Sequence, residues 1–106
     1  MAHHRSPRVN KALMANHSGQ TVRLIAKLIT FKDDMATVEA SDRGELDVKL
    51  LPDFNHRSTY LEVIGKVMND KTIKMEQYLN MGDDIDMKFA DQAVRIWHDA
   101  RFTAVF

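Results

Sequence analysis

Five short stretches in which apolar residues recur at every second position, separated by turn-forming residues, fill the middle of this 106-residue chain. Alternation of this kind predicts strands with one buried face. The stretches are residues 21–31, 35–40, 45–51, 60–68 and 72–79. Gly65 interrupts the fourth, and a glycine inside a strand often marks a bulge or a sharp bend. Five short strands with polar turns and one point of curvature predict a small closed barrel of the all-β class.

Helical patterns flank the strands on both sides. Near the amino terminus, Asn10 is a suitable N-cap and Val9 with Met14 can form an apolar staple, so one short helical turn is expected. Asp86 is a suitable N-cap for a second, longer helix. These patterns divide the chain into a flexible N-terminus (1–7), a barrel with an N-terminal lead (8–84), and a C-terminal assembly helix with its tail (85–106).

The C-terminal helix is apolar over roughly half of its circumference, which is wider than the stripe of about 100° that packs on one core. When successive residues are placed about 100° apart, the arc resolves into two seams. One seam holds Phe89, Ala93, Ile96 and Ala100, and the other holds Met87, Ala90, Val94 and Trp97. The polar side holds Lys88, Asp91, Gln92, Arg95, His98 and Asp99. Because two seams suit a helix with two neighbours, at least one seam is expected to meet another protein.

Individual apolar residues of this helix have alternative interpretations. Trp97 is singled out because large aromatic side chains often anchor interfaces, and the less favoured alternative is that it closes the bottom of the chain's own barrel. Phe89 and Ile96 are balanced between the barrel and partner helices. Phe102 and Phe106 either extend the contact or belong to a frayed end.

Composition excludes several classes of protein. Lysine and arginine number 15, as do aspartate and glutamate, so no overall positive field attracts nucleic acid. The absence of cysteine excludes a disulfide framework, a thiolate zinc site and a cysteine nucleophile, and it fits a reducing compartment. No apolar run approaches the roughly 18 residues of a membrane span, and the first residues do not resemble a signal peptide. We expect a soluble intracellular protein, and we assign no function to the initial "MAHH".

Catalysis has little support in the sequence. The acidic residues Asp83, Asp84 and Asp86 lack the alternating ligand pattern of a calcium loop, and helix capping explains their position. The five histidines include no pair at helical ligand spacing and no companion nucleophile system. The sequence therefore predicts no active site, no cofactor and no metal.

Three segments carry a resemblance to a known family: "RVNKALMANHSGQTVRLIAKL", "LEVIGKV" and "AVRIWHD". From about Arg8 to Phe102 the chain resembles the small subunit of replication protein A, the eukaryotic heterotrimer that coats single-stranded DNA. One departure is Ala26, where the family is expected to have glycine, and this leaves the local bend of the first strand open. The resemblance implies an OB-fold barrel and a C-terminal helix that packs with one helix from each of the large and middle subunits.

The resemblance also implies a nuclear protein with a structural role in DNA replication, repair and recombination. Nine residues of the helix and tail are then the candidates for the subunit interface: Met87, Phe89, Ala90, Ala93, Val94, Ile96, Trp97, Ala100 and Phe102.

Direct contact with DNA is expected to be weak. OB-folds that bind single strands use exposed aromatic residues in a basic groove, and residues 35–40 and 45–51 contain no aromatic residue. Arg43, Lys49 and Lys74 are candidates for weak, salt-dependent phosphate contacts, with solvated surface charge as the alternative. A second hypothesis is an autonomous single-stranded nucleic-acid-binding module, which would bind an oligonucleotide as a monomer.

Overall fold

The computed structural model describes residues 6–55 and 58–103, with side chains up to residue 96. It confirms the five strands and the two helical patterns. The elements are the 3₁₀ helix η2 (Met14–His17), the strands β1 (Thr21–Lys32), β2 (Met35–Ala40), β3 (Glu45–Lys49), β4 (Tyr60–Asn69) and β5 (Thr72–Gly82), and the helix α1 (Met87–Thr103).

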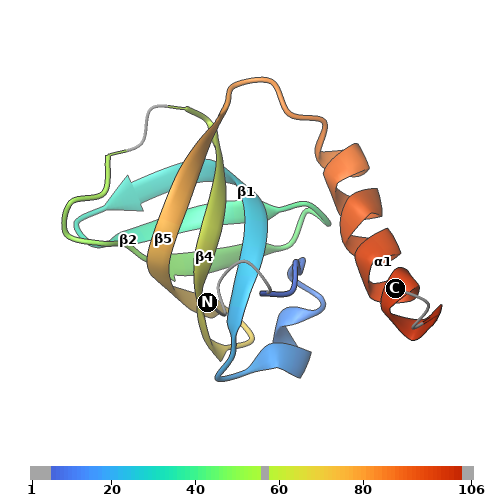
Figure 1. Ribbon diagram of the computed structural model, residues 1–106. Helices are drawn as coiled ribbons and strands as arrows, with labels where there is room; N and C mark the ends of the chain where they lie inside the picture. Colours follow the sequence, from blue (N-terminus) through green and yellow to red (C-terminus); the bar gives the residue numbers. More distant parts are fainter. Residues whose placement is uncertain (1–5, 56–57, 104–106) are drawn as a thin grey trace.

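The strands form a closed barrel in the order β1-β2-β3-β5-β4. The long β1 pairs with β4 through its first half and with β2 through its second half. Closure comes from the parallel pairing of β3 with β5, in which Val48 lies opposite Ile73. The barrel is therefore the small closed barrel that the strand pattern predicts and the five-stranded OB-fold that the family resemblance implies, and Figure 1 shows α1 standing beside it.

The core is formed by the alternate residues that the strand pattern places on one face. Val22, Leu24 and Ala26 of β1 are fully buried, whereas Leu28 is only partly buried. The segment before β1, residues 8–20, is called the lead. It closes one end of the core, since Val9 and Met14, the predicted staple, are also fully buried in the same cluster. The lead thus contributes to the fold as a part of the barrel.

Gly65 is the point of curvature in β4. The register of the β4–β5 pair shifts between Ile64 and Gly65, as at a bulge. A Cβ on Gly65 would overlap the backbone oxygen of Lys74 and lie 2.7 Å from Cγ2 of Ile73. Only glycine leaves room for β5 to approach β4 this closely, which confirms the sequence-based interpretation of this residue.

Ala26 lies in a regular part of β1. It pairs with Leu61 of β4 on one side and with Ala40 of β2 on the other. The irregularity of this strand falls instead between Leu28 and Thr30, where the β1–β2 register shifts. The bend that the sequence leaves open at Ala26 is therefore located further along the strand.

Candidate assembly surface

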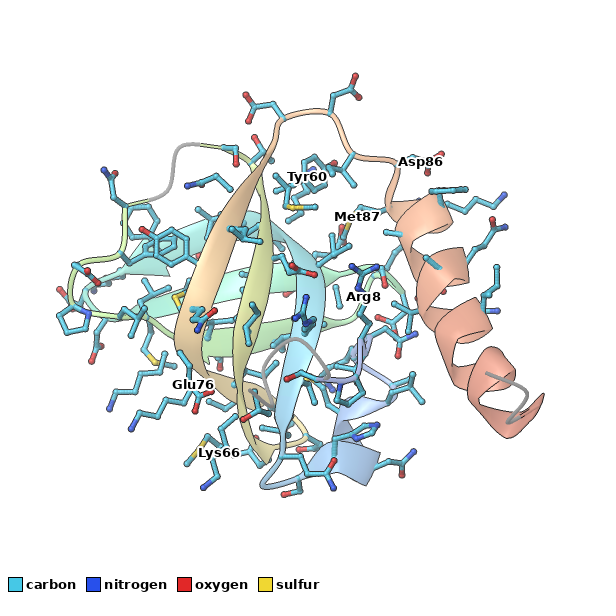
Figure 2. The ribbon with its side chains drawn as sticks, viewed as in Figure 1. Arg8, Tyr60, Lys66, Glu76, Asp86 and Met87 are labelled. Atoms are coloured by element: carbon cyan, nitrogen blue, oxygen red, sulfur yellow. The ribbon has the colours of Figure 1, made fainter. Side chains whose placement is uncertain are left out.

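The helix α1 begins at a side-chain cap. One carboxylate oxygen of Asp86, Oδ1, accepts hydrogen bonds from the backbone N–H groups of Lys88 at 3.0 Å and Phe89 at 3.2 Å. Figure 2 shows Asp86 at the start of the helix. Asp83 has a different role, because its Oδ1 accepts a hydrogen bond from the backbone N–H of Thr59 at 2.7 Å. The acidic residues before the helix thus include a cap and a loop contact.

The two predicted seams of α1 have different surroundings. Ala90 and Val94 are buried, at 7% and 2% exposure. Phe89 and Ile96 are 69% and 65% exposed. Ala93 is half-buried between the two sets. We call the surface formed by Phe89, Ala93 and Ile96 the outer face of α1.

Among the remaining candidates for the subunit interface, the structure describes the side chain of Met87 alone. Met87 is half-buried, and Figure 2 shows it on the barrel side of the helix start. The side chains of Trp97, Ala100 and Phe102 lie outside the described residues, so their partners stay a prediction. The chain itself therefore covers Ala90 and Val94, and it leaves Phe89 and Ile96 in solvent.

A buried carboxylate joins α1 to the barrel. Asp91 is only 7% exposed. Its Oδ1 accepts hydrogen bonds from Nδ2 of Asn10 and from Oγ of Ser41, both at 2.9 Å, and its Oδ2 accepts one from Nε of Arg95 at 3.0 Å. Hydrogen bonds to a charged group contribute about 1.5–3 kcal/mol each, and they offset the cost of burying the carboxylate. We call Asn10, Ser41, Asp91 and Arg95 the Asp91 cluster.

Sequence reasoning placed Asp91 on the polar side of the helix and did not select it. Its position offers two signals. It flanks the apolar arc next to Val94, and Arg95 follows four residues later, where a helical ion pair forms.

The turn between β2 and β3 fixes the position of the lead. The carboxylate of Asp42 accepts hydrogen bonds from the backbone N–H groups of Lys11 at 3.2 Å and Ala12 at 3.0 Å. The lead also runs beside β1, since the backbone N–H of Val9 donates to the oxygen of Arg23 at 2.8 Å. Asn10 and Ser41 therefore approach Asp91 from two segments that are bonded to each other.

Arg8, which is exposed, makes a second contact between the lead and the barrel with a buried carboxylate. Its Nε lies 3.8 Å from Oε2 of Glu62 on β4, and Glu62 is 4% exposed. A carboxylate this deeply buried requires a charged or hydrogen-bonding partner. Arg8, Asn10 and Glu62 all belong to the segments that carry the family resemblance. Those segments therefore include both residues of the Arg8–Glu62 ion pair and one donor to Asp91.

A cleft of about 800 Å³ lies between the barrel and the first turns of α1. Its lining holds four basic residues, Lys27, Arg43, Lys88 and Arg95, and four acidic residues, Glu39, Asp42, Asp86 and Asp91. Opposite charges in such balance give no net preference for an anionic ligand. The cleft therefore separates the helix from the barrel without forming an obvious ligand site.

The candidate DNA contacts lie in two places. Lys49 and Lys74 are directly opposite each other in the parallel β3–β5 pair, and Lys66 of β4 is opposite Lys74 on its other side. All three lysines are exposed. Arg43 is instead in the β2–β3 turn, with a φ of 69°, and lines the cleft beside α1. The pairing thus brings two of the three candidates together and adds Lys66 to them.

β3, the strand that carries Lys49, contains no aromatic residue. The ring centroids of Phe31 and Phe54 are 6.4 Å apart, and those of Phe54 and Tyr78 are 4.8 Å apart, both in edge-to-face arrangement. Phe54 and Tyr78 pack against the barrel core, whereas Phe31 is 49% exposed. The contacts of this cluster are typical of packing rather than of a row of stacking platforms along β2 and β3.

Within the described part of the chain, no three histidine or acidic residues are grouped so that they could hold a metal ion. No helix in that part is long and apolar enough to cross a membrane.

Comparison with known proteins identifies relatives along nearly the whole chain. The family model of replication factor A protein 3 matches residues 1–102. A 14 kDa subunit of replication protein A from Arabidopsis thaliana is 37% identical over 82 residues, which cover 76% of this chain and 74% of that protein. Replication factor A protein 3 of Schizosaccharomyces pombe is 29% identical over 97 residues, 88% of each chain.

A solved structure matches the arrangement of these elements as well. A chain in the structure of Ustilago maydis replication protein A bound to single-stranded DNA superimposes with a TM-score of 0.84 and is 28% identical. The match covers 95% of this chain and 94% of that one. The likeness thus extends over both the barrel and most of the helix that follows it.

Proposed function

Because this chain belongs to the replication factor A protein 3 family, we propose that it is the small subunit of a replication protein A heterotrimer that binds and protects single-stranded DNA. Members of this family are subunits of a replication complex and are not enzymes. The role that we assign to this chain is to support assembly through α1. It acts with the large and middle subunits.

The observation that carries the assembly role is the exposure of the outer face. Phe89 and Ile96 are large, apolar and about two-thirds exposed, at 69% and 65%, on a helix whose opposite side already contacts the barrel. Large apolar side chains at the centre of an interface commonly dominate its binding energy. We therefore propose that the outer face packs against one helix from each of the other two subunits in a three-helix bundle.

Direct DNA contact has a minor part in this proposal. The row of Lys49, Lys74 and Lys66 supports weak contact with phosphates, whose strength falls with added salt. The absence of aromatic residues from β2 and β3 disfavours the autonomous module. We also propose that the complex works in the nucleus, in DNA replication, repair and recombination, where single strands are exposed.

The test is co-purification of the full chain with the large and middle subunits. Replacing both Phe89 and Ile96 with glutamate places two charges on the outer face, and we expect at least about tenfold weaker assembly. The matched control is Met68→Glu, which changes an apolar residue of 50% exposure on β4. The control should co-purify like the wild type.

Barrel folding is measured beside assembly by circular dichroism and thermal unfolding. Loss of co-purification with an unchanged barrel supports the proposal. A double variant that retains both subunits at wild-type yield contradicts it. A wild-type monomer that binds a single-stranded oligonucleotide as tightly as the complex would favour the autonomous module instead.

A further inference from the structure

Over the helix side chains that the structure describes, up to residue 96, apolar packing alone is a weak determinant of how α1 is oriented on the barrel. Among its described apolar side chains, only Ala90 and Val94 are buried, and both are small. Neither belongs to the main hydrophobic core cluster of the chain. Apolar burial is also non-directional, so two small side chains leave the rotation and tilt of a helix poorly defined.

Hydrogen bonds can define the rotation and tilt of the helix, because the strength of a hydrogen bond depends on the angle at its donor. Asp91 receives such bonds from Asn10 in the lead and from Ser41 after β2, each at 2.9 Å. The two donors come from segments that Asp42 bonds together. Asp91 of the helix is thus hydrogen-bonded to two segments, the lead and the β2–β3 turn, that are themselves hydrogen-bonded to each other.

We propose that the Asp91 cluster is an orientation lock, which fixes α1 on the barrel so that the outer face is presented in a single direction. This inference rests on the proposed assembly role, because a fixed direction of the outer face matters only if that face binds partners. The hydrogen bonds that form the lock lie within the chain itself. Arg95, whose side chain is 71% exposed, holds the second oxygen of Asp91 at 3.0 Å and keeps the carboxylate turned towards its donors.

The lock has a measurable consequence for assembly. If α1 samples many directions, only a fraction of molecules presents the outer face correctly, and apparent affinity falls by that fraction. The contacts in the complex stay the same. A variant without the lock should therefore associate more slowly with its partners, whereas loss of an outer-face contact should speed dissociation.

Spin labels report the orientation directly in the full chain. The sequence contains no cysteine, so Lys49→Cys and Gln92→Cys create two unique labelling sites, one on β3 and one on α1. Both positions are exposed. Distances between the labels are measured by electron paramagnetic resonance in the isolated chain, with Asp91→Ala as the test and Lys88→Ala, on the same helix, as the matched control.

We expect a narrow distribution of distances in the wild type and in Lys88→Ala, and a broad one in Asp91→Ala, in which the barrel remains folded. A distribution as narrow as the wild type overturns the lock. If Asp91→Ala fails to fold, Ser41→Ala removes one donor and should broaden the distribution in part, and an unbroadened result there also overturns the proposal.

Affinity for the other two subunits completes the experiment. Asp91→Ala should lose about tenfold if the correct orientation falls to about a tenth of the population, and the loss should appear in the association rate. Broadened distances with unchanged affinity would refute the role in assembly. If the outer-face double variant still assembles, the proposed function fails, while the label distances still decide the lock.

Discussion

Replacing Gly65 with alanine would test whether the curvature of the barrel depends on the close approach of β5 to β4. The new Cβ would overlap the carbonyl oxygen of Lys74, a backbone atom that has no freedom to rotate away. Relief therefore requires a shift of β5. Overpacking costs about 1–3 kcal/mol, and the backbone clash places this variant near 3 kcal/mol. With an unfolding entropy of about 2.1 cal/mol/K per residue, a chain of 106 residues should melt about 13 °C lower.

Gly19→Ala is the matched control, because it separates backbone strain from steric overlap. Gly19 has a φ of 81°, and an added Cβ would meet no atom within 4 Å. A left-handed alanine costs about 1 kcal/mol, so this variant should melt only about 4–5 °C lower. Thermal unfolding is followed by circular dichroism. A Gly65→Ala chain that melts at the wild-type temperature, or above Gly19→Ala, would refute the close-approach argument.

Three further predictions concern the helix and the surface. Reversing the charges of Lys49 and Lys74 to glutamate should change the DNA affinity of the complex less than about tenfold, and titrations at two salt concentrations check this. Asp86→Ala should remove the cap of α1 and cost about 1 kcal/mol, seen as faster hydrogen exchange of the Lys88 and Phe89 amides. The isolated chain should self-associate weakly through the exposed outer face, and analytical ultracentrifugation at rising concentration should detect it, whereas a strict monomer would contradict it.

Local alternation was sufficient to predict the strands, but it did not specify how they pair. Val48 and Ile73 alternate with polar neighbours in their own strands, and this pattern places both side chains in the core. Their parallel pairing depends on the closure of the whole barrel, which no single segment encodes. The resemblance to a family implied an OB-fold barrel, and the structure confirms that fold.

The two seams of α1 illustrate a different limit. Val94 and Ile96 are equally apolar, so periodicity cannot tell which of them faces the barrel and which faces solvent. Asp91 was assigned to the polar side from its angular position on the helix, at about 100° per residue. Its partners Asn10 and Ser41 lie far away in the sequence, and only the folded chain brings them together.

Closure of the barrel also sets an order of events during synthesis. The first half of β1 has no neighbouring barrel strand until β4 is made, and β3 keeps an open edge until β5 follows. The helix α1 comes after β5, so it docks on a barrel that already carries Asn10 and Ser41. Phe89 and Ile96 therefore leave the ribosome after every strand of the barrel. The apolar surface that would bind wrong partners is thus synthesised only after the strands of the barrel.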